Sequence, residues 1–277
     1  MQFDNTRTFN WEGAFHGMRA PLESWAKSDS AFGYCYEDAE EDFEVLNTWR
    51  EHDKYNEMTE AERTKYDEEK LAWLDNNGCI YYDVGSRVME YAFLGPADLD
   101  LAQRLIKAGP EHRKFLRQIF VSAYITLPIQ VWKQLDTYKI GTVTNSTSTM
   151  HKIQSKPLTR DCFEIEEIPY EEQKEMEQRD GLFCVGEISD LFDETIQTCE
   201  DLRKAFNETK DRRYWRKLIE LLPESYLQAR ELTLNYEVLR SIVHQRKGHK
   251  LHEWEKFIHW AHTLPYAEEL IFYDGNK

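Results

Sequence analysis

Between Ile119 and Leu127 apolar side chains recur at every second residue, and this alternation constrains the fold more than any other feature of the chain. A period of two places one set of side chains on one face of an extended segment, which predicts a β-strand with a single apolar face. Pro128 then suits the first position of a helix over "PIQVWKQLDTY". The chain must therefore build at least one sheet beside its helices.

The remaining elements follow from helical or extended patterns and from their stop signals. The expected helices cover residues 58–74, 97–109, 181–206, 214–222 and 236–248, and segments rich in strand formers cover 79–95 and 226–234. Gly109 is the expected stop of its helix, which has Asp98 near its start, while Asn235 is the expected N-cap of the helix closed by Gly248. The strongly charged residues 36–77 predict a surface insertion, because little of this stretch could be buried.

The net charge of −16 disfavours binding to a nucleic acid polymer, yet the charge is uneven. Residues 101–160 hold ten lysine and arginine residues against two acids, Glu111 and Asp136, a local balance of +8. A basic centre inside an acidic protein suits a small anion, such as a nucleotide phosphate, better than a polymer.

Several classes of protein are disfavoured by what the sequence lacks. No apolar run approaches the roughly 20 residues of a membrane span, and the N-terminus has no signal-peptide pattern, so we expect a cytoplasmic protein that does not bind membranes. The five cysteines form no C-x-x-C pair and are expected to be reduced. The nine histidines form no H-x-x-x-H pair, and no metal site is expected.

Residues Thr142 to Ser148, here called the polar run, contain six Thr, Ser or Asn side chains out of seven. Lys139 precedes the run, and His151 and Lys152 follow it. The run is no P-loop, since it has one neighbouring glycine and no G-K-(S/T), and it contains no G-x-S-x-G elbow. A solvated linker and the wall of a polar pocket both remain open. In a pocket, hydroxyl and amide groups could bind phosphate oxygens, a ribose and a pyrimidine edge.

Two further constellations have both a plain and a functional interpretation. The sequence from His112 to Lys114 is either a solvated basic cluster or part of an anion site. On the expected helix 236–248, four residues spaced by 4, 3 and 4 share one face. They are Asn235, Leu239, Ile242 and Arg246. This face is either a core stripe that ends in an arginine reaching solvent, or one wall of a site. In either case Arg246 should point inward while Lys247 faces solvent.

The order of these features also carries information. A Gly-Pro-Glu-His turn at residues 109–112 precedes the strand, and a helix with "VWKQ" and the polar run come next. Leu222-Pro223, "TLN" and a helix carrying Arg246 follow. This order resembles the flavin-dependent thymidylate synthases, the ThyX-like family. Their signature is R-H-R-x-x-S-x-N-x-x-S-x-R-Y, preceded by H-x-(S/T)-x-x-E-H.

Two stretches match the family's spacing without a gap, one from His112 to Thr142 and one from Leu222 to Arg246. The resemblance is strongest over residues 109–273, about 165 residues, and a weaker "RAPLESW" lies near the start.

The central signature departs from the family pattern. Its R-H-R becomes Thr137-Tyr138-Lys139, so one cation of three remains. A one-residue insertion after Thr142 brings Asn145 and Ser148 to the Asn and second Ser positions. Four further parts of the pattern are replaced. Arg117-Gln118 replaces the E-H pair, and Met150-His151 replaces the closing R-Y. Glu237 replaces the Arg two residues after the motif Asn, and Ile219 replaces the Arg four residues before the L-P proline. The chain thus resembles a divergent, phage-type branch.

The resemblance implies an α+β fold of mixed helices with an antiparallel sheet, forming a single catalytic domain over residues 1–277 with a charged insertion at about 36–77. It implies FAD as cofactor, methylenetetrahydrofolate and NADPH as co-substrates, dUMP as the nucleotide and a homotetramer. The implied reaction is methylation of dUMP to dTMP, or of a close variant. Two alternatives stay open, a pyrimidine nucleotide hydroxymethylase on the same fold and a nucleotide-binding protein that has lost flavin.

The family's functional positions carry over onto eight residues of this chain. They are the flavin contacts His112, Lys139 and Asn235, the nucleotide ligands Gln134, Ser146 and Ser148, the orienting amide Asn145, and the catalytic Arg246, which would bind the substrate and polarise the pyrimidine. On this interpretation the polar run is a wall of the nucleotide pocket.

Overall fold

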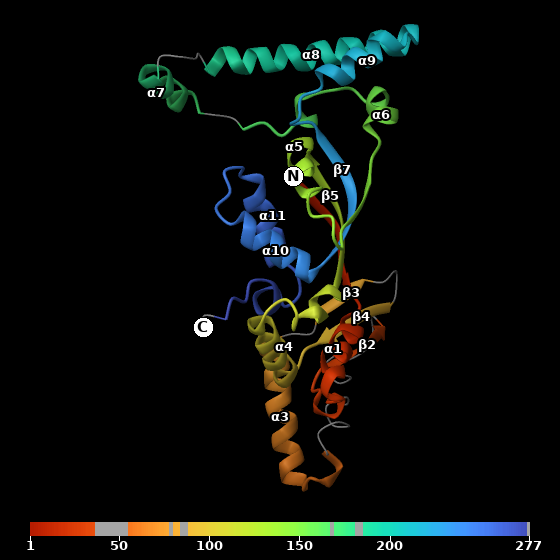
Figure 1. The fold of residues 1–277 in the computed structure, drawn as a ribbon, viewed down its shortest axis with the longest axis vertical. Coiled ribbons are helices and arrows are strands. Elements are labelled where there is room, and N and C mark those ends of the chain that lie inside the picture. The colour runs from red at the N-terminus through yellow and green to blue at the C-terminus, as the bar shows by residue number, and fades with distance from the viewer. Residues whose placement is uncertain (37–54, 78–79, 84–87, 167–168, 181–184, 276–277) are drawn as a thin grey trace. The chain divides into compact units, whose positions relative to one another are not determined.

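The structure, a computed structural model, describes residues 1–277 except 37–54, 78–79, 84–87, 167–168, 181–184 and 276–277 (Figure 1). The chain divides into two compact units. Unit 1 comprises Met1–Asp4, Tyr124–Lys139 and Thr144–Leu232, and unit 2 comprises Asn5–Ala123, Ile140–Val143 and Thr233–Lys277. The single catalytic domain over the whole chain stays a prediction.

One sheet has four strands in the order β1-β5-β7-β6. Their bounds are β1 (Gln2–Phe9), β5 (Phe120–Pro128), β6 (Val143–Ser146) and β7 (Leu227–Asn235). Along β5 half-buried and buried side chains alternate, so the strand predicted from the period of two is confirmed. The strand predicted over 226–234 is confirmed as β7. Pro128 ends β5 and is the N-cap of the next helix, which therefore begins one residue later than expected.

A second sheet lies within unit 2 and has three strands in the order β2-β4-β3. The strands are β2 (Ala31–Tyr36), β3 (Ile80–Asp83) and β4 (Val88–Phe93). Both pairs are antiparallel, with Ala31 opposite Phe93 and Ile80 opposite Ala92. The strand formers of residues 79–95 thus give two strands, while residues 79 and 84–87 lie outside the described residues. Helices together with an antiparallel sheet confirm the predicted α+β class.

The described residues contain a helix in each predicted range, and they also contain α1, α6, α7, α11 and a π-helix, which the sequence did not predict. Unit 2 contains α1 (Trp11–Arg19), α3 (Glu60–Asn77), α4 (Pro96–Ala108), α10 (Tyr236–Arg246), α11 (Glu253–His262) and a short π-helix (Ala267–Ile271). Unit 1 contains α5 (Ile129–Leu135), α6 (Thr149–Lys152), α7 (Tyr170–Asp180), α8 (Val185–Thr209) and α9 (Arg212–Leu221). Short 3-10 turns cover Ala20–Leu22, Trp25–Lys27, Tyr55–Glu57, Lys114–Arg117, Ile153–Ser155 and Arg160–Cys162.

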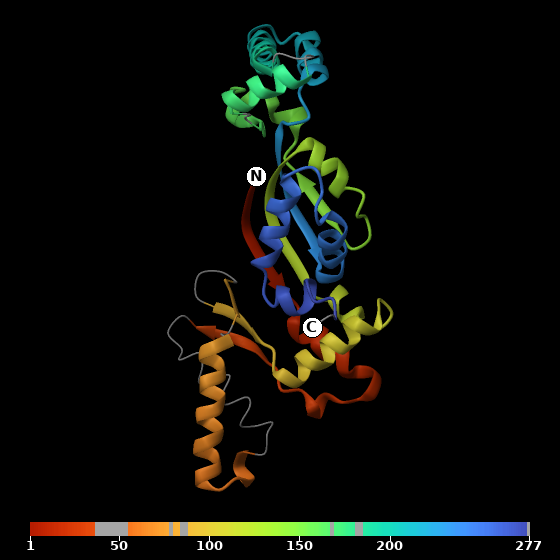
Figure 2. The ribbon, with the colours of Figure 1, turned by 90° about the vertical axis from the view of Figure 1, so that its left-hand side faces the viewer.

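The charged insertion is described only in part. Its helix, α3, is one continuous helix (Figure 2) and confirms that a helix lies in the range predicted as 58–74. Residues 37–54 of the insertion, like residues 181–184 at the start of the helix predicted over 181–206, lie outside the described residues.

The core of unit 2 is built from aromatic side chains around α1 and α10. Trp11 is buried and meets the ring of Tyr236 edge to face, with centroids 5.3 Å apart. Phe15, one turn further along α1, meets Phe115 at 5.8 Å. Such pairs contribute roughly 0.5–1.5 kcal/mol beyond the area that they bury. The start of α10 is therefore fixed against α1.

Asp98 in the first turn of α4 is fully buried within unit 2. Its carboxylate accepts hydrogen bonds from Arg19 Nε at 2.5 Å and from the hydroxyls of Ser28 and Ser30, both at 2.6 Å. Asp29 caps the same helix by accepting from the backbone N–H groups of Ala97 and Asp98. The sequence predicted Asp98 as a helix-start residue, but the structure makes it the centre of a buried ion pair.

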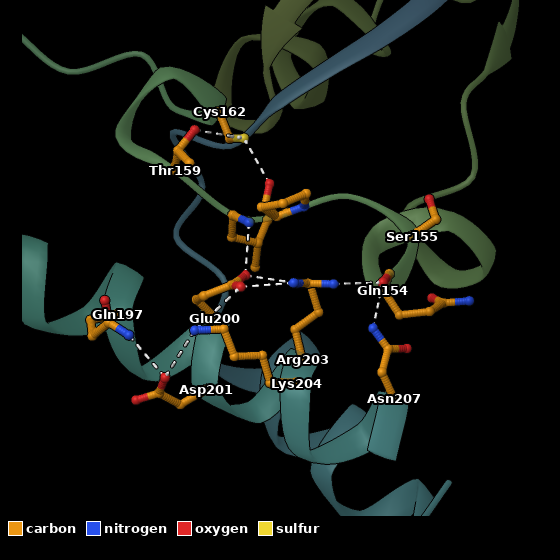
Figure 3. Close-up of polar contacts among 12 residues, drawn as sticks. Gln154, Ser155, Thr159, Cys162, Gln197, Glu200, Asp201, Arg203, Lys204 and Asn207 are labelled. Carbon is orange, nitrogen blue, oxygen red and sulfur yellow. Dashed lines mark hydrogen bonds and ion pairs between the residues drawn. The ribbon is translucent and has the colours of Figure 1, made fainter. Parts of the chain in front are cut away.

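Glu200 on α8 organises the polar part of unit 1 (Figure 3). Its carboxylate accepts from Arg203 Nε at 2.6 Å, from Arg203 Nη2 at 2.7 Å and from the backbone N–H of Leu158 at 2.9 Å. Hydrogen bonds from Arg203, aided by the Leu158 N–H and by the charges of Arg203 and Lys204, lower the pKa of Glu200 from 4.5 to about 2. The pair ties the loop before Leu158 to α8.

This lowered pKa makes part of the stability depend on pH. A carboxyl group whose pKa is lower in the folded state contributes stability above its unfolded pKa and loses it as pH falls through the folded pKa. Wild type should therefore lose its stability advantage over Glu200→Gln, about 3 kcal/mol, as pH falls from about 5 to 2. Urea unfolding of both proteins across this range measures the advantage.

Asp201, the exposed neighbour of Glu200, provides the matched control. The difference between wild type and Asp201→Asn should stay small and nearly flat with pH. An equal pH dependence in the two variants would contradict the role assigned to Glu200.

Candidate functional site

The polar run is an edge strand followed by a short helix, and not a linker. Residues Val143–Ser146 form β6, the last strand in the sheet order β1-β5-β7-β6. Edge strands are commonly polar because apolar ones invite pairing with other chains. Asn145 and Ser146 are exposed on this strand. Ser148 is the N-cap of α6, where its Oγ accepts from the backbone N–H of His151 at 3.2 Å.

Two residues of β7 hold the end of the polar run in unit 1. Gln228 Nε2 donates to the Thr147 carbonyl and to Thr149 Oγ1, both at 3.1 Å. Arg230 Nε donates to Gln228 Oε1 at 3.0 Å, and the Arg230 guanidinium lies 4.4 Å from the ring centroid of Trp132. This pair was not predicted from the sequence. Its signal was the period of two in β7, which puts residues 228 and 230 on one face.

The other residues predicted in unit 1 lie on or after α5. Gln134 is half-buried on α5, whereas Lys139 is exposed two residues before Gly141. Asp136, between them, accepts from Arg230 Nη1 at 2.9 Å. The helix is thus tied to β7 by Arg230, and this contact fixes the segment from which Gln134 projects.

The beginning of the polar run and its preceding glycine, Gly141, belong to unit 2, where Gly141 approaches Asn235. Asn235 is 5% exposed, and its Oδ1 accepts from the backbone N–H of Val238 at 3.0 Å, which confirms the predicted N-cap of α10. Gly141 has φ +77°, and a Cβ there would lie 2.6 Å from Asn235 Nδ2. Within the described part of the chain, Thr142 Oγ1 is buried without a hydrogen-bond partner.

The close approach at Gly141 predicts a destabilised alanine variant. Gly248 shares the left-handed backbone, with φ +71°, but a Cβ there would meet nothing within 4 Å. Gly248→Ala should therefore cost only the conformational strain, about 1–2 kcal/mol, whereas Gly141→Ala should cost about 2–5 kcal/mol because the new methyl group also overlaps Asn235. Urea unfolding of both variants gives the comparison. Equal losses would mean that Asn235 moves aside freely.

Arg246 ends the α10 face that was predicted from spacing. Leu239 and Ile242 on this face are fully buried, Arg246 is half-buried and Lys247 is exposed. The Arg246 guanidinium lies 4.5 Å from the ring centroid of the buried Trp254. The predicted directions of Arg246 and Lys247 are thus observed, and a cation–π contact with Trp254 holds the guanidinium.

The N-terminal end of α10 carries an ion pair between Glu237 and Arg113. Glu237 accepts from Arg113 Nε at 2.9 Å and from Arg113 Nη2 at 3.0 Å. The two residues are separated by 124 positions in the sequence. The family pattern has an arginine at the position of Glu237, so the charge at this position is reversed. The guanidinium of Arg113 is occupied by its ion pair with Glu237.

His112 lines a cavity of about 850 Å³ within unit 2. Apolar side chains of the lining include Leu101, Leu105 and Phe115. Charged ones include the cations Lys27 and Lys114 and the carboxylates Glu23, Asp100 and Glu111. The volume lies in the range that is typical of sites for small molecules and cofactors. His112 is exposed on this cavity.

The predicted site residues therefore fall into two groups. Unit 1 carries Gln134, Lys139, Asn145, Ser146 and Ser148, and unit 2 carries His112, Asn235 and Arg246. Within unit 2, Asn235 lies beside Gly141, the residue that precedes the polar run. Arg246 lies eleven residues further along α10, or about 16 Å at the helical rise per residue, so one small group could not contact both.

Two kinds of feature are absent from the described residues. Within those ranges, none of the helices combines the length and the apolar character that crossing a bilayer requires. Likewise, no three His, Cys, Asp or Glu side chains of the described residues gather as a metal-binding group.

This chain is similar to known proteins in its structure, whereas the comparisons of its sequence found no match. No protein-family model matches the chain, and no curated protein matches it. The flavin-dependent thymidylate synthase ThyX from Helicobacter pylori, complexed with FAD and dUMP, superposes with a TM-score of 0.55 at 14% identity over 100% of both chains. A second structure of that enzyme with FAD and dUMP gives a TM-score of 0.53 at 16% identity, over 99% of this chain and 98% of the other.

A UMP/dUMP methylase, PolB from Streptomyces cacaoi bound with 5-Br UMP, superposes less well, with a TM-score of 0.43 and 11% identity over 64% of this chain and 83% of the other. The two ThyX superpositions span the whole length of the chain and include its helices and sheets. The chain has the fold of the flavin-dependent thymidylate synthase ThyX.

Proposed function

We propose that this protein is a flavin-dependent nucleotide methyltransferase that converts dUMP to dTMP, or acts on a close variant of dUMP. The observation that carries the proposal is the superposition over the full chain on a ThyX structure that holds FAD and dUMP. The proposal includes methylenetetrahydrofolate as carbon donor, NADPH as reductant, a single catalytic domain, a homotetramer and a cytoplasmic location.

The residues of this chain fit a flavin nucleotide. The cavity beside His112 offers apolar side chains for a ring system and lysines for an anionic tail. The buried Thr142 hydroxyl has an unused hydrogen-bonding capacity, and an unpaired buried polar group costs about 1–3 kcal/mol until a partner meets it. Lys139 adds an exposed cation three residues before Thr142. When bound, reduced flavin supplies the hydride, so the chain needs to provide no nucleophilic thiol.

Binding of the nucleotide is assigned to groups on the polar run and α5. Gln134, Asn145, Ser146 and Ser148 would hydrogen-bond the nucleotide, and Gln228 would keep the run in place by holding Thr147. Arg246 would polarise a pyrimidine carbonyl, because a guanidinium presents two parallel N–H donors. Trp254 would orient that guanidinium.

A nucleotide-binding protein without flavin is the second candidate. The charge reversal at Glu237 favours it, since a carboxylate replaces a cation that the family pattern places there, and Arg113 is engaged with that carboxylate. Repulsion between this carboxylate and a flavin phosphate would weaken binding if the two lay close together.

Purification of the full chain distinguishes the two candidates. A yellow protein with flavin absorbance, which converts dUMP when given methylenetetrahydrofolate and NADPH, supports the methyltransferase. Mass analysis of the product separates a methyl from a hydroxymethyl group, and the latter would replace the proposal with the hydroxymethylase. A colourless chain that takes up no FAD but binds dUMP would establish the second candidate.

The lysines around the polar run provide a matched pair for the same assay. Lys139→Gln should weaken FAD binding about tenfold or more, as expected for the loss of one charge-assisted contact. Lys152→Gln, which removes an exposed cation of α6, should leave FAD affinity unchanged. Equal effects in both variants would indicate a general electrostatic influence and no specific contact of Lys139.

A further inference from the structure

A cavity of about 300 Å³ lies within unit 1, apart from the eight predicted site residues. It is lined by Met150, His151, Gln154, Phe206, Arg212 and Trp215. These residues come from α6 and the turn after it, from α8 and from α9. The volume is at the lower end of the range for small-molecule sites, so one ring with a short charged tail fits and a dinucleotide such as FAD does not.

Aromatic and thioether groups form the apolar part of the lining. Phe206 and Trp215 are half-buried, and Met150 is largely exposed. Trp215 packs on the core cluster of Ile153 and Leu218, which fixes its position. Aromatic rings held in this way favour a planar ring, because stacking depends on the faces of the two ring systems and not on the identity of the ligand's base.

Gln154 contributes a side-chain oxygen that accepts no hydrogen bond from the described residues. Its Oε1 is buried and has no hydrogen-bond partner in the described residues, whereas its Nε2 donates to the His151 carbonyl at 2.8 Å. The backbone carbonyl of Gln154 accepts from Arg203 Nη1 at 3.0 Å and from Asn207 Nδ2 at 2.9 Å (Figure 3). Since both ends of the residue are held, its acceptor stays at the cavity and would pair with a ligand N–H.

Arg212 supplies a cation that has no carboxylate to neutralise it in the described part of the chain. The neighbouring arginines of α9 differ in this respect, since Arg213 binds Asp211 and Arg216 binds Glu220. Arg212 faces the cavity together with His151. An unpaired guanidinium beside an aromatic wall favours a phosphate, which accepts two parallel N–H groups.

We propose that this cavity binds a nucleoside monophosphate whose base donates an N–H to Gln154, stacks between Phe206 and Trp215, and places its phosphate on Arg212. This would be a second nucleotide site, separate from the proposed catalytic residues. It requires neither flavin nor methyl transfer, so the proposed function can fail while this site stands.

Calorimetric titration of the full chain with cytidine 5′-monophosphate, whose one-ring base carries an amino N–H donor, tests the site in the presence of saturating dUMP. The dUMP would occupy the proposed catalytic site. One molecule should bind per chain. Arg212→Gln should weaken binding about tenfold or more, and the control Arg213→Gln should not, because Arg213 is already paired. Gln154→Leu should weaken binding as well, while circular dichroism and melting temperature confirm that each variant is folded.

Several results would overturn the proposal. They are a lack of binding at millimolar nucleotide, complete displacement by dUMP, equal losses in Arg212→Gln and Arg213→Gln, or inorganic phosphate binding as tightly as the nucleotide. The last result would reveal a simple anion site. Cytidine without phosphate should bind much more weakly than the monophosphate, and equal binding would exclude the role of Arg212.

Discussion

Arg246→Lys should lower kcat/KM for dUMP about 30- to 1000-fold. The substitution keeps the positive charge but removes the planar pair of donors, and the loss of such a contact in a transition state costs about 2–4 kcal/mol. Stability should change little, because a lysine can also lie over the Trp254 ring and a cation–π contact at a partly exposed site is worth about 0.5–1 kcal/mol. Steady-state kinetics, dUMP titration and thermal melting of this variant are the measurements.

Lys247 supplies the control, since it is the exposed neighbour on the same turn. Lys247→Gln should leave kinetics, affinity and melting temperature unchanged. If Arg246→Lys melts at a lower temperature but keeps its activity and its dUMP affinity, Arg246 is a structural residue of the α10–α11 region and has no catalytic role.

Asp98→Asn should destabilise the protein by about 3–5 kcal/mol, the cost of removing one partner from a buried ion pair. The amide leaves the buried guanidinium of Arg19 without its counter-charge and disturbs the hydroxyls of Ser28 and Ser30. For a chain of this length the melting temperature should fall by roughly 6–20 °C, and urea unfolding should give the corresponding loss in free energy.

Asp100, on the same helix, provides the matched control. It pairs with Arg104 at 2.9 Å, but both side chains are 67% exposed. An exposed pair of this kind contributes about 0.3–0.5 kcal/mol, so Asp100→Asn should change the melting temperature by no more than a degree or two. Similar losses in the two variants would show that burial of the Arg19–Asp98 pair is not what makes it important.

In the four-stranded sheet, the strands that the sequence predicted are the inner ones. β5 and β7 lie between neighbours in the four-stranded sheet, and the apolar side chains of β5 alternate because one face is buried. β1 and β6 are the edge strands, and their polar sequences carry no such alternation. For β6 this absence suggested a loop or a pocket wall. Its strand conformation depends on pairing with β7, which a local pattern cannot reveal.

The candidate site, like the sheet, was predictable from the sequence only in part. Local signals gave the N-cap at Asn235 and the inward direction of Arg246, since both depend on the period and the end of one helix. The Arg113–Glu237 pair, the Gln228 contacts with the polar run and the Arg19–Asp98 pair were not predictable. Each joins residues separated by about 80 or more positions, and only the tertiary structure decides such contacts.

The interleaving of the two units has a consequence for the genetic dissection of this protein. The chain changes unit after residues 4, 123, 139, 143 and 232, so neither unit is encoded by one uninterrupted stretch of the gene. A fragment that holds all of unit 1 must run from residue 1 to residue 232, and one that holds all of unit 2 must run from residue 5 to residue 277, so each fragment also contains most of the other unit.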